Sequence, residues 1–130
     1  MRLFLLMMMA GFTGISAQAQ KCKIATVDPE WLDPQTLLVV LHTPGPKWNH
    51  GKLFFEQVGV RDHALHYKKF SDAGKIYLGG PFLDSTGGMM VAVPGTDLTE
   101  LVKFAEADPA IISGLLSCEV RYWQLKMFKK

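Results

Sequence analysis

The chain has 130 residues, of which 48% are hydrophobic and 20% are charged. Its formal net charge is +2, and acidic and basic residues are interspersed. The sequence therefore lacks the basic stripe that is typical of a nucleic-acid surface, and we expect no nucleic-acid partner. The length suits one domain with one hydrophobic core, and any function must fit that core.

The first 19 residues have the pattern of a secretory signal peptide. Met1-Arg2 precedes an apolar run over residues 3–10, which is too short to cross a bilayer, since a spanning helix needs about 20 residues. Ala17-Gln18-Ala19 then supplies the small-x-small pattern of a cleavage site. We therefore expect cleavage after Ala19 and a periplasmic or secreted mature protein without membrane contact.

Export changes the interpretation of the two cysteines, because oxidising compartments permit disulfides. Cys22 and Cys118 are 96 positions apart in the sequence. An internal disulfide, two free thiols and an intermolecular bridge are all compatible with the sequence.

The first half of the mature chain predicts an arm, a strand and a helix. Residues 20–35 contain two prolines and no sustained periodicity, so we interpret them as a lead-in arm before a domain over residues 36–128. The Leu- and Val-rich run over residues 36–42 predicts a strand buried on both faces. The loop over residues 44–52 is long, and long ordered loops tend to carry function.

A helical pattern follows over residues 54–73, and Gly74 is typical of a helix C-terminus. Its apolar stripe consists of Val60, His63, Tyr67 and Phe70, and its opposite, solvated face carries Arg61, Lys68, Lys69 and Asp72. His63 lies in the middle of the stripe. It therefore needs a partner or a cavity, because burial of an unpaired polar group costs about 1–3 kcal/mol.

The second half predicts a hairpin, a helix and a last strand. Residues 75–79 and 89–93 form the hairpin around a turn over residues 82–88. Thr96 or Asp97 can cap a helix through Ala107, which Asp108-Pro109 ends. Alternation over residues 118–127 predicts the last strand. The order βαββαβ is that of an α+β, ferredoxin-like domain, whose four antiparallel strands carry both helices on one face.

Several motifs in this order resemble the YciI-like (YCII-related) family. They are Val60-Arg61-Asp62-His63, Ala73-Gly74-Lys75, Gly79-Gly80-Pro81-Phe82, Ala107-Asp108-Pro109, Gly114 and Glu119-Val120-Arg121. The resemblance implies a dimeric α/β-barrel, in which two sheets pack face to face, with a pocket between the first helix and the sheet of each subunit. It also implies a catalytic pair of His63 and Asp108. An apolar sheet face independently favours a homodimer, because monomers rarely expose large apolar patches.

Some relatives in that family act on substituted aromatic compounds. We therefore expect acid/base chemistry of lyase, isomerase or hydrolase type on a small organic, aromatic-derived molecule, without a metal or cofactor. The spacing of His63 and His66 offers half of a metal site, but no Cys or carboxylate completes it in the sequence. The expected substrate-binding residues are His42, Trp48, Tyr67, Gly80, Pro81 and Phe82.

Two alternatives remain open from the sequence. His63 is equally well explained as a core histidine that a backbone carbonyl satisfies. The chain would then be a non-enzymatic small-ligand-binding or interaction module on the same dimeric barrel.

Overall fold

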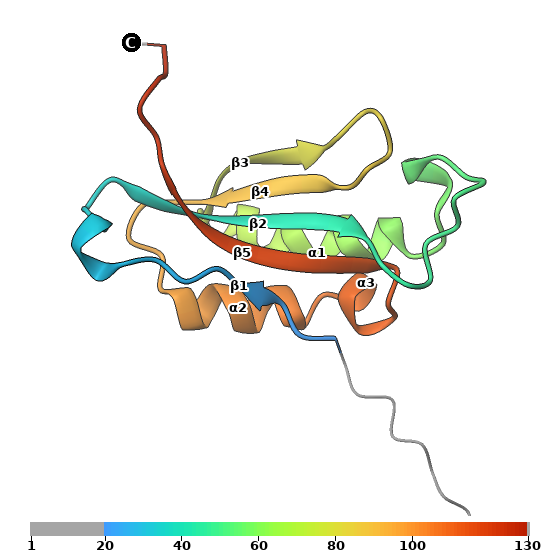
Figure 1. Cartoon of the computed structure of the whole chain (residues 1–130). Coiled ribbons are helices and arrows are strands. Elements are labelled where there is room, and N and C mark those ends of the chain that lie inside the picture. Colours follow the sequence, from blue (N-terminus) through green and yellow to red (C-terminus); the bar gives the residue numbers. More distant parts are fainter. Residues whose placement is uncertain (1–19, 130) are drawn as a thin grey trace, which may run out of the picture.

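The computed structural model of the chain describes residues 20–129, and the expected signal peptide over residues 1–19 lies outside them. Its described part is an α+β domain, in which a mixed sheet carries its helices on one face (Figure 1). This arrangement is compatible with a ferredoxin-like fold.

The sheet is organised around its longest pairing, between β2 (Thr36–Pro44) and β5 (Leu116–Gln124). β2 also pairs antiparallel with β4 (Gly88–Ala92), which forms the predicted hairpin with β3 (Ile76–Pro81). The strand order is β1-β5-β2-β4-β3. Its last four strands have the order expected for βαββαβ connectivity, with the first and third strands in the middle of the sheet.

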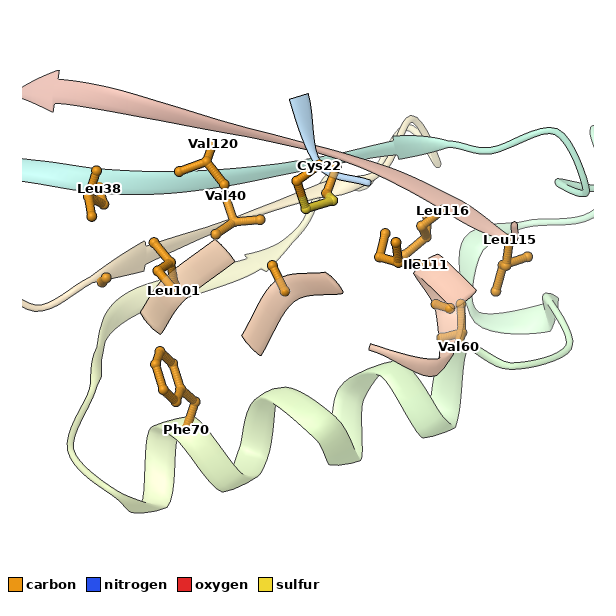
Figure 2. Close-up of a cluster of buried hydrophobic side chains, with 14 of the residues drawn as sticks. Cys22, Leu38, Val40, Val60, Phe70, Leu101, Ile111, Leu115, Leu116 and Val120 are labelled. Atoms are coloured by element: carbon orange, nitrogen blue, oxygen red, sulfur yellow. A yellow bond between two sulfur atoms is a disulfide. The ribbon is translucent and has the colours of Figure 1, made fainter. Parts of the chain in front are cut away.

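The lead-in arm forms part of the sheet, which the sequence did not predict. Its strand β1 (Lys23–Ile24) pairs parallel with β5, and a 3₁₀ turn, η1 (Pro29–Trp31), follows. A disulfide joins Cys22 to Cys118 on β5, with Cα atoms 4.7 Å apart, so the internal pairing is confirmed among the three alternatives. Figure 2 shows this disulfide among the core side chains beneath the sheet.

The first helix is shorter than expected. A 3₁₀ turn, η2 (Phe54–Glu56), replaces its predicted beginning, and α1 covers Val60–Asp72. Gly59 precedes α1 with φ of 102°, a left-handed conformation that interrupts a continuous helix. Gln57 is also diverted, because its side-chain amide donates to the carbonyl oxygens of Asn49 and Lys52.

The two later helices differ in how well the sequence predicted them. The helix α2 (Leu98–Glu106) begins as expected at Asp97, whose side chain accepts from the Glu100 backbone N–H. A short helix, α3 (Pro109–Ile112), follows where the sequence predicted only a stop. Among residues 20–129, no helix is long and apolar enough to span a membrane.

Alternate residues of β2 point to opposite faces of the sheet and are buried on both, as predicted. Leu38 and Val40 belong to the main core, which fills the space between the sheet and the helices (Figure 2). Leu37 and Val39 form a smaller cluster with Val91 on the face away from the helices. The second face is thus apolar although no described helix covers it.

Removal of the disulfide should destabilise the fold substantially. The bond closes a loop of 96 residues, and such a cross-link restricts the unfolded chain, which corresponds to about 2–5 kcal/mol of the free energy of unfolding. In urea with dithiothreitol, we expect residues 20–130 to unfold at a lower midpoint, with a free energy of unfolding that is lower by this amount. The Cys22→Ser/Cys118→Ser variant should have the same urea midpoint as the reduced protein, and this midpoint should not change when reductant is added. Equal midpoints with and without reductant would contradict the assignment.

Candidate functional site

A buried hydrogen bond joins His63 on α1 to Asp108 at the start of α3. The His63 Nδ1 and Asp108 Oδ2 atoms are 2.5 Å apart, and the residues are 5% and 0% exposed. His63 lies in the apolar stripe of α1 that the sequence predicted, whereas Asp108 is the N-cap of α3, which contacts α1. The two groups implied by the family resemblance therefore meet in space.

Asp108 is fixed by a second interaction. It is the N-cap of α3, and its Oδ1 accepts from the Ala110 backbone N–H at 2.9 Å, while Pro109 occupies the first helical position. Burial acts to raise the pKa of the Asp108 carboxyl, but the hydrogen bond from His63 and the charge of His63 outweigh it and hold this pKa below its usual range. The carboxylate can only accept, so His63 Nδ1 carries the proton. Its Nε2 is the nitrogen left for a ligand.

A second buried histidine, His42, lies near the end of β2. Its ring centroid is 4.8 Å from that of His63, and its Nε2 lies 3.0 Å from the Tyr67 hydroxyl. Burial, together with the neighbouring His63, lowers the pKa of His42 to about 3, so His42 is neutral at physiological pH. Burial also raises the pKa of Tyr67, which keeps its hydroxyl protonated. His42 Nδ1 is enclosed and has no hydrogen-bond partner among the described residues.

Both histidines border a cavity of about 300 Å³, which we call the His63 cavity. It lies between the first turns of α1, η2 and the adjoining ends of three strands. Its lining consists of His42, Phe54, Phe55, Val60, Arg61, His63, Ala64, Gly80, Pro81, Gly88, Met89 and Met90. This volume is at the lower end of the range of small-molecule sites, and the lining is mostly apolar, as is usual for such sites.

The predicted substrate-binding residues divide into three groups. His42, Gly80 and Pro81 line the His63 cavity, as the sequence suggested. Tyr67 lies behind His42 and contacts its ring instead of the cavity. Trp48 packs on Phe54 and borders a separate hollow, and the half-exposed Phe82 lies outside the cavity lining.

Several cavity residues were missed because no sequence period marks them. Arg61 was assigned to the solvated face of its helix, and it is exposed, but it also borders the cavity at the first turn of α1. Phe54 and Phe55 reach the cavity from η2, which the sequence merged into the helix. The segment of β4 that borders the cavity, from Gly88 to Met90, could have been inferred only from the strand register.

The possible metal half-site of His63 and His66 is not formed in the structure, but another group of potential ligands is present. His66 stacks on Phe104, and its Nε2 lies 2.8 Å from the Phe104 carbonyl oxygen, so it is engaged elsewhere. His42, His63 and Asp108 instead each offer a ligand atom, and these atoms lie within 4.8 Å of one another. These nitrogen and oxygen donors suit a divalent cation chemically. Use of Asp108 Oδ2 and His63 Nδ1 as ligands would require their mutual hydrogen bond to open.

The buried neutral His42 should make the fold sensitive to mild acid. Its pKa of about 3 in the folded state lies below the ordinary value of 6.5, so the unfolded chain binds more protons between these pH values. This group therefore lowers stability by about 1.4 kcal/mol per pH unit as pH falls below 6.5. We expect His42→Gln to reduce the pH dependence of the unfolding free energy between pH 6.5 and 4.5. Parallel urea-derived profiles for the two proteins would contradict this.

Comparison with known proteins gives one relative of high coverage. The uncharacterized protein YjpA of Bacillus subtilis (strain 168) is 31% identical to this chain over 72 residues, which are 55% of this chain and 84% of YjpA. No family model matches the chain, and no solved structure matches it. The identity and coverage show that this chain belongs to the same family as YjpA.

Proposed function

We propose that this chain is an exported, YciI-like protein that performs acid/base chemistry on a small organic molecule in the His63 cavity. The observation that carries the proposal is the buried hydrogen bond between His63 Nδ1 and Asp108 Oδ2 at the wall of an apolar cavity. A histidine that is fixed by a carboxylate and faces a ligand-sized space is a common arrangement of a general base.

The chemistry follows from the proton positions. Asp108 holds the proton on Nδ1, so Nε2 is the His63 atom that takes a proton from the substrate. The imidazolium that forms is stabilised by the adjacent Asp108 carboxylate, which is ionised and buried. His42 stays neutral and offers hydrogen bonding to the reacting molecule without competing for the proton.

Two further observations support the family and location parts of the proposal. The motifs of the resemblance supply cavity residues from separate elements, namely His63 from α1 and Gly80-Pro81 from β3. The Cys22–Cys118 disulfide is a bond that oxidising, extracytoplasmic compartments maintain, which supports a periplasmic or secreted location.

Substitution of His63 separates catalysis from simple binding. We expect His63→Gln to remain folded and to lose turnover by about 10²-fold or more, because glutamine keeps a hydrogen-bonding group but cannot act as a base. The matched control is His66→Gln, on the same helix, whose imidazole bonds the Phe104 carbonyl and does not border the cavity. Turnover is measured on a panel of aromatic and lactone substrates, with and without a chelator.

The same measurements identify a failed proposal. Near-wild-type turnover in folded His63→Gln would end the acid/base assignment. Loss of turnover on chelation, restored by a divalent ion, would replace metal-free chemistry with a metal site at the same residues. Saturable binding without any product would instead favour the non-enzymatic binding module.

We also propose a homodimer in which two sheets pack through their helix-free faces as a barrel. The support is the apolar cluster of Leu37, Val39 and Val91 on that face. Cross-strand neighbours share a face, so Leu78 opposite Val91 and Trp123 opposite Leu37 extend the apolar surface, and these two are 46% and 39% exposed. A contiguous apolar surface of this kind is typical of an interface.

A charge placed on this face should dissociate the dimer. We expect the native chain to sediment at twice its mass and Leu78→Lys to shift it toward monomer, because a lysine ammonium would have to be buried. Leu65→Lys is the control, since Leu65 is similarly exposed at 49% but lies on α1. A wild-type monomer at micromolar concentration would refute the barrel, as would an equal response of the two variants.

A further inference from the structure

The polar groups of the His63 cavity are distributed unevenly. Phe54, Pro81, Met89 and Met90 give the sheet and η2 sides an apolar surface, whereas the α1 side carries a cation. Arg61 is the charged residue of the lining, which contains no Asp or Glu. A purely apolar ligand would form no polar contact with the Arg61 guanidinium, and a cationic ligand would be repelled by it.

Arg61 is free to bind a ligand. Among residues 20–129 its guanidinium forms no salt bridge and no hydrogen bond, in contrast to Lys68 on the same helix, which pairs with Asp72 at 2.7 Å. A guanidinium presents a planar fork of N–H donors that matches a carboxylate. Its position at the mouth of an apolar cavity provides one anchor point for an acid.

The start of α1 adds a further donor on the same side. Gly59, the N-cap, supplies no side chain to cap the helix, and the bonds within the described part of the chain leave the backbone N–H of Arg61, which borders the cavity, without an acceptor. Unpaired N–H groups at a helix N-terminus favour an anion. Asp62 offsets part of this field, but its side chain is exposed and does not border the cavity.

An independent observation comes from His42. This side chain is 1% exposed and borders the cavity, and its Nδ1 has no partner in the described chain. An unpaired buried donor or acceptor is unfavourable, so a ligand that pairs with His42 Nδ1 gains binding free energy. If Tyr67 donates to Nε2, His42 carries its proton on Nδ1 and becomes a neutral donor toward a ligand oxygen.

We infer that the His63 cavity takes a small organic carboxylate, whose anionic group lies against Arg61 and the first turn of α1 and whose apolar body fills the remaining space. The volume of about 300 Å³ limits that body to one ring or a short acyl chain. His42 and His63 then face the ligand beyond its carboxylate. This inference rests on the proposed function only in that the same cavity is taken as the ligand site.

The test compares acids with their neutral amides. NMR titrations of ¹⁵N-labelled native dimer or monomer, as isolated, use benzoate against benzamide and butanoate against butanamide. We expect at least one acid to bind about tenfold or more tightly than its amide. Arg61→Gln should abolish the preference, and Arg61→Lys should retain part of it.

Lys69→Gln is the matched control, because it makes the same charge change on the exposed face of the same helix. Equal affinity of acid and amide in both pairs, absence of acid binding, or equal effects of Arg61→Gln and Lys69→Gln would overturn the inference. His63-dependent turnover of a neutral substrate would then leave the proposed function standing. Arg61-dependent acid binding without any His63-dependent turnover would support this inference and contradict the proposed acid/base function.

Discussion

The buried Asp108 carboxylate is the group on which the helical layer and the site both depend. A charge without exposure is tolerated only when its lone pairs are satisfied, and Asp108 meets that condition with the Ala110 N–H on one oxygen and His63 Nδ1 on the other. The first bond starts α3, and the second ties α3 to α1. Both local folding and the orientation of the His63 imidazole therefore depend on a single side chain.

The position of His42 depends on a different constraint, which is the close approach of the β2 backbone to the backbones of its neighbouring strands. His42 pairs with Gly88 on β4 and with Cys118 on β5, so its strand is held on both sides. Gly87 has φ of 123°, and a Cβ there would collide with the His42 carbonyl oxygen. A glycine in the β3–β4 turn thus permits β4 to approach β2 at the cavity, while the disulfide secures β5 from the other side.

Sequence periodicity predicted the elements in which buried and exposed side chains alternate regularly. It failed where contacts outside the element decide where a helix or strand begins. The stripe of Val60, His63, Tyr67 and Phe70 is buried as predicted, because helical spacing alone places it. The predicted beginning of that helix was wrong, since the Gln57 side chain donates to carbonyl oxygens of the preceding loop and Gly59 adopts a left-handed conformation before α1. Strand β1 and helix α3 are each too short for a period. The His63–Asp108 contact joins residues 45 apart, which spacing could not reveal and the family resemblance did imply.

The two neighbouring imidazoles are placed in environments that give them different roles. His42 and His63 lie 4.8 Å apart between ring centroids, yet His63 is paired with a carboxylate and His42 with a neutral phenol. Burial, together with the neighbouring His63, outweighs the charge of Asp108 and lowers the pKa of His42 to about 3, so His42 remains a neutral hydrogen-bonding group. Because two protonated imidazoles at this distance would repel each other, the neutrality of His42 is consistent with the acid/base role proposed for His63. The proposal of proton transfer in this cavity therefore rests on the unequal pairing of the two rings more than on the presence of two histidines.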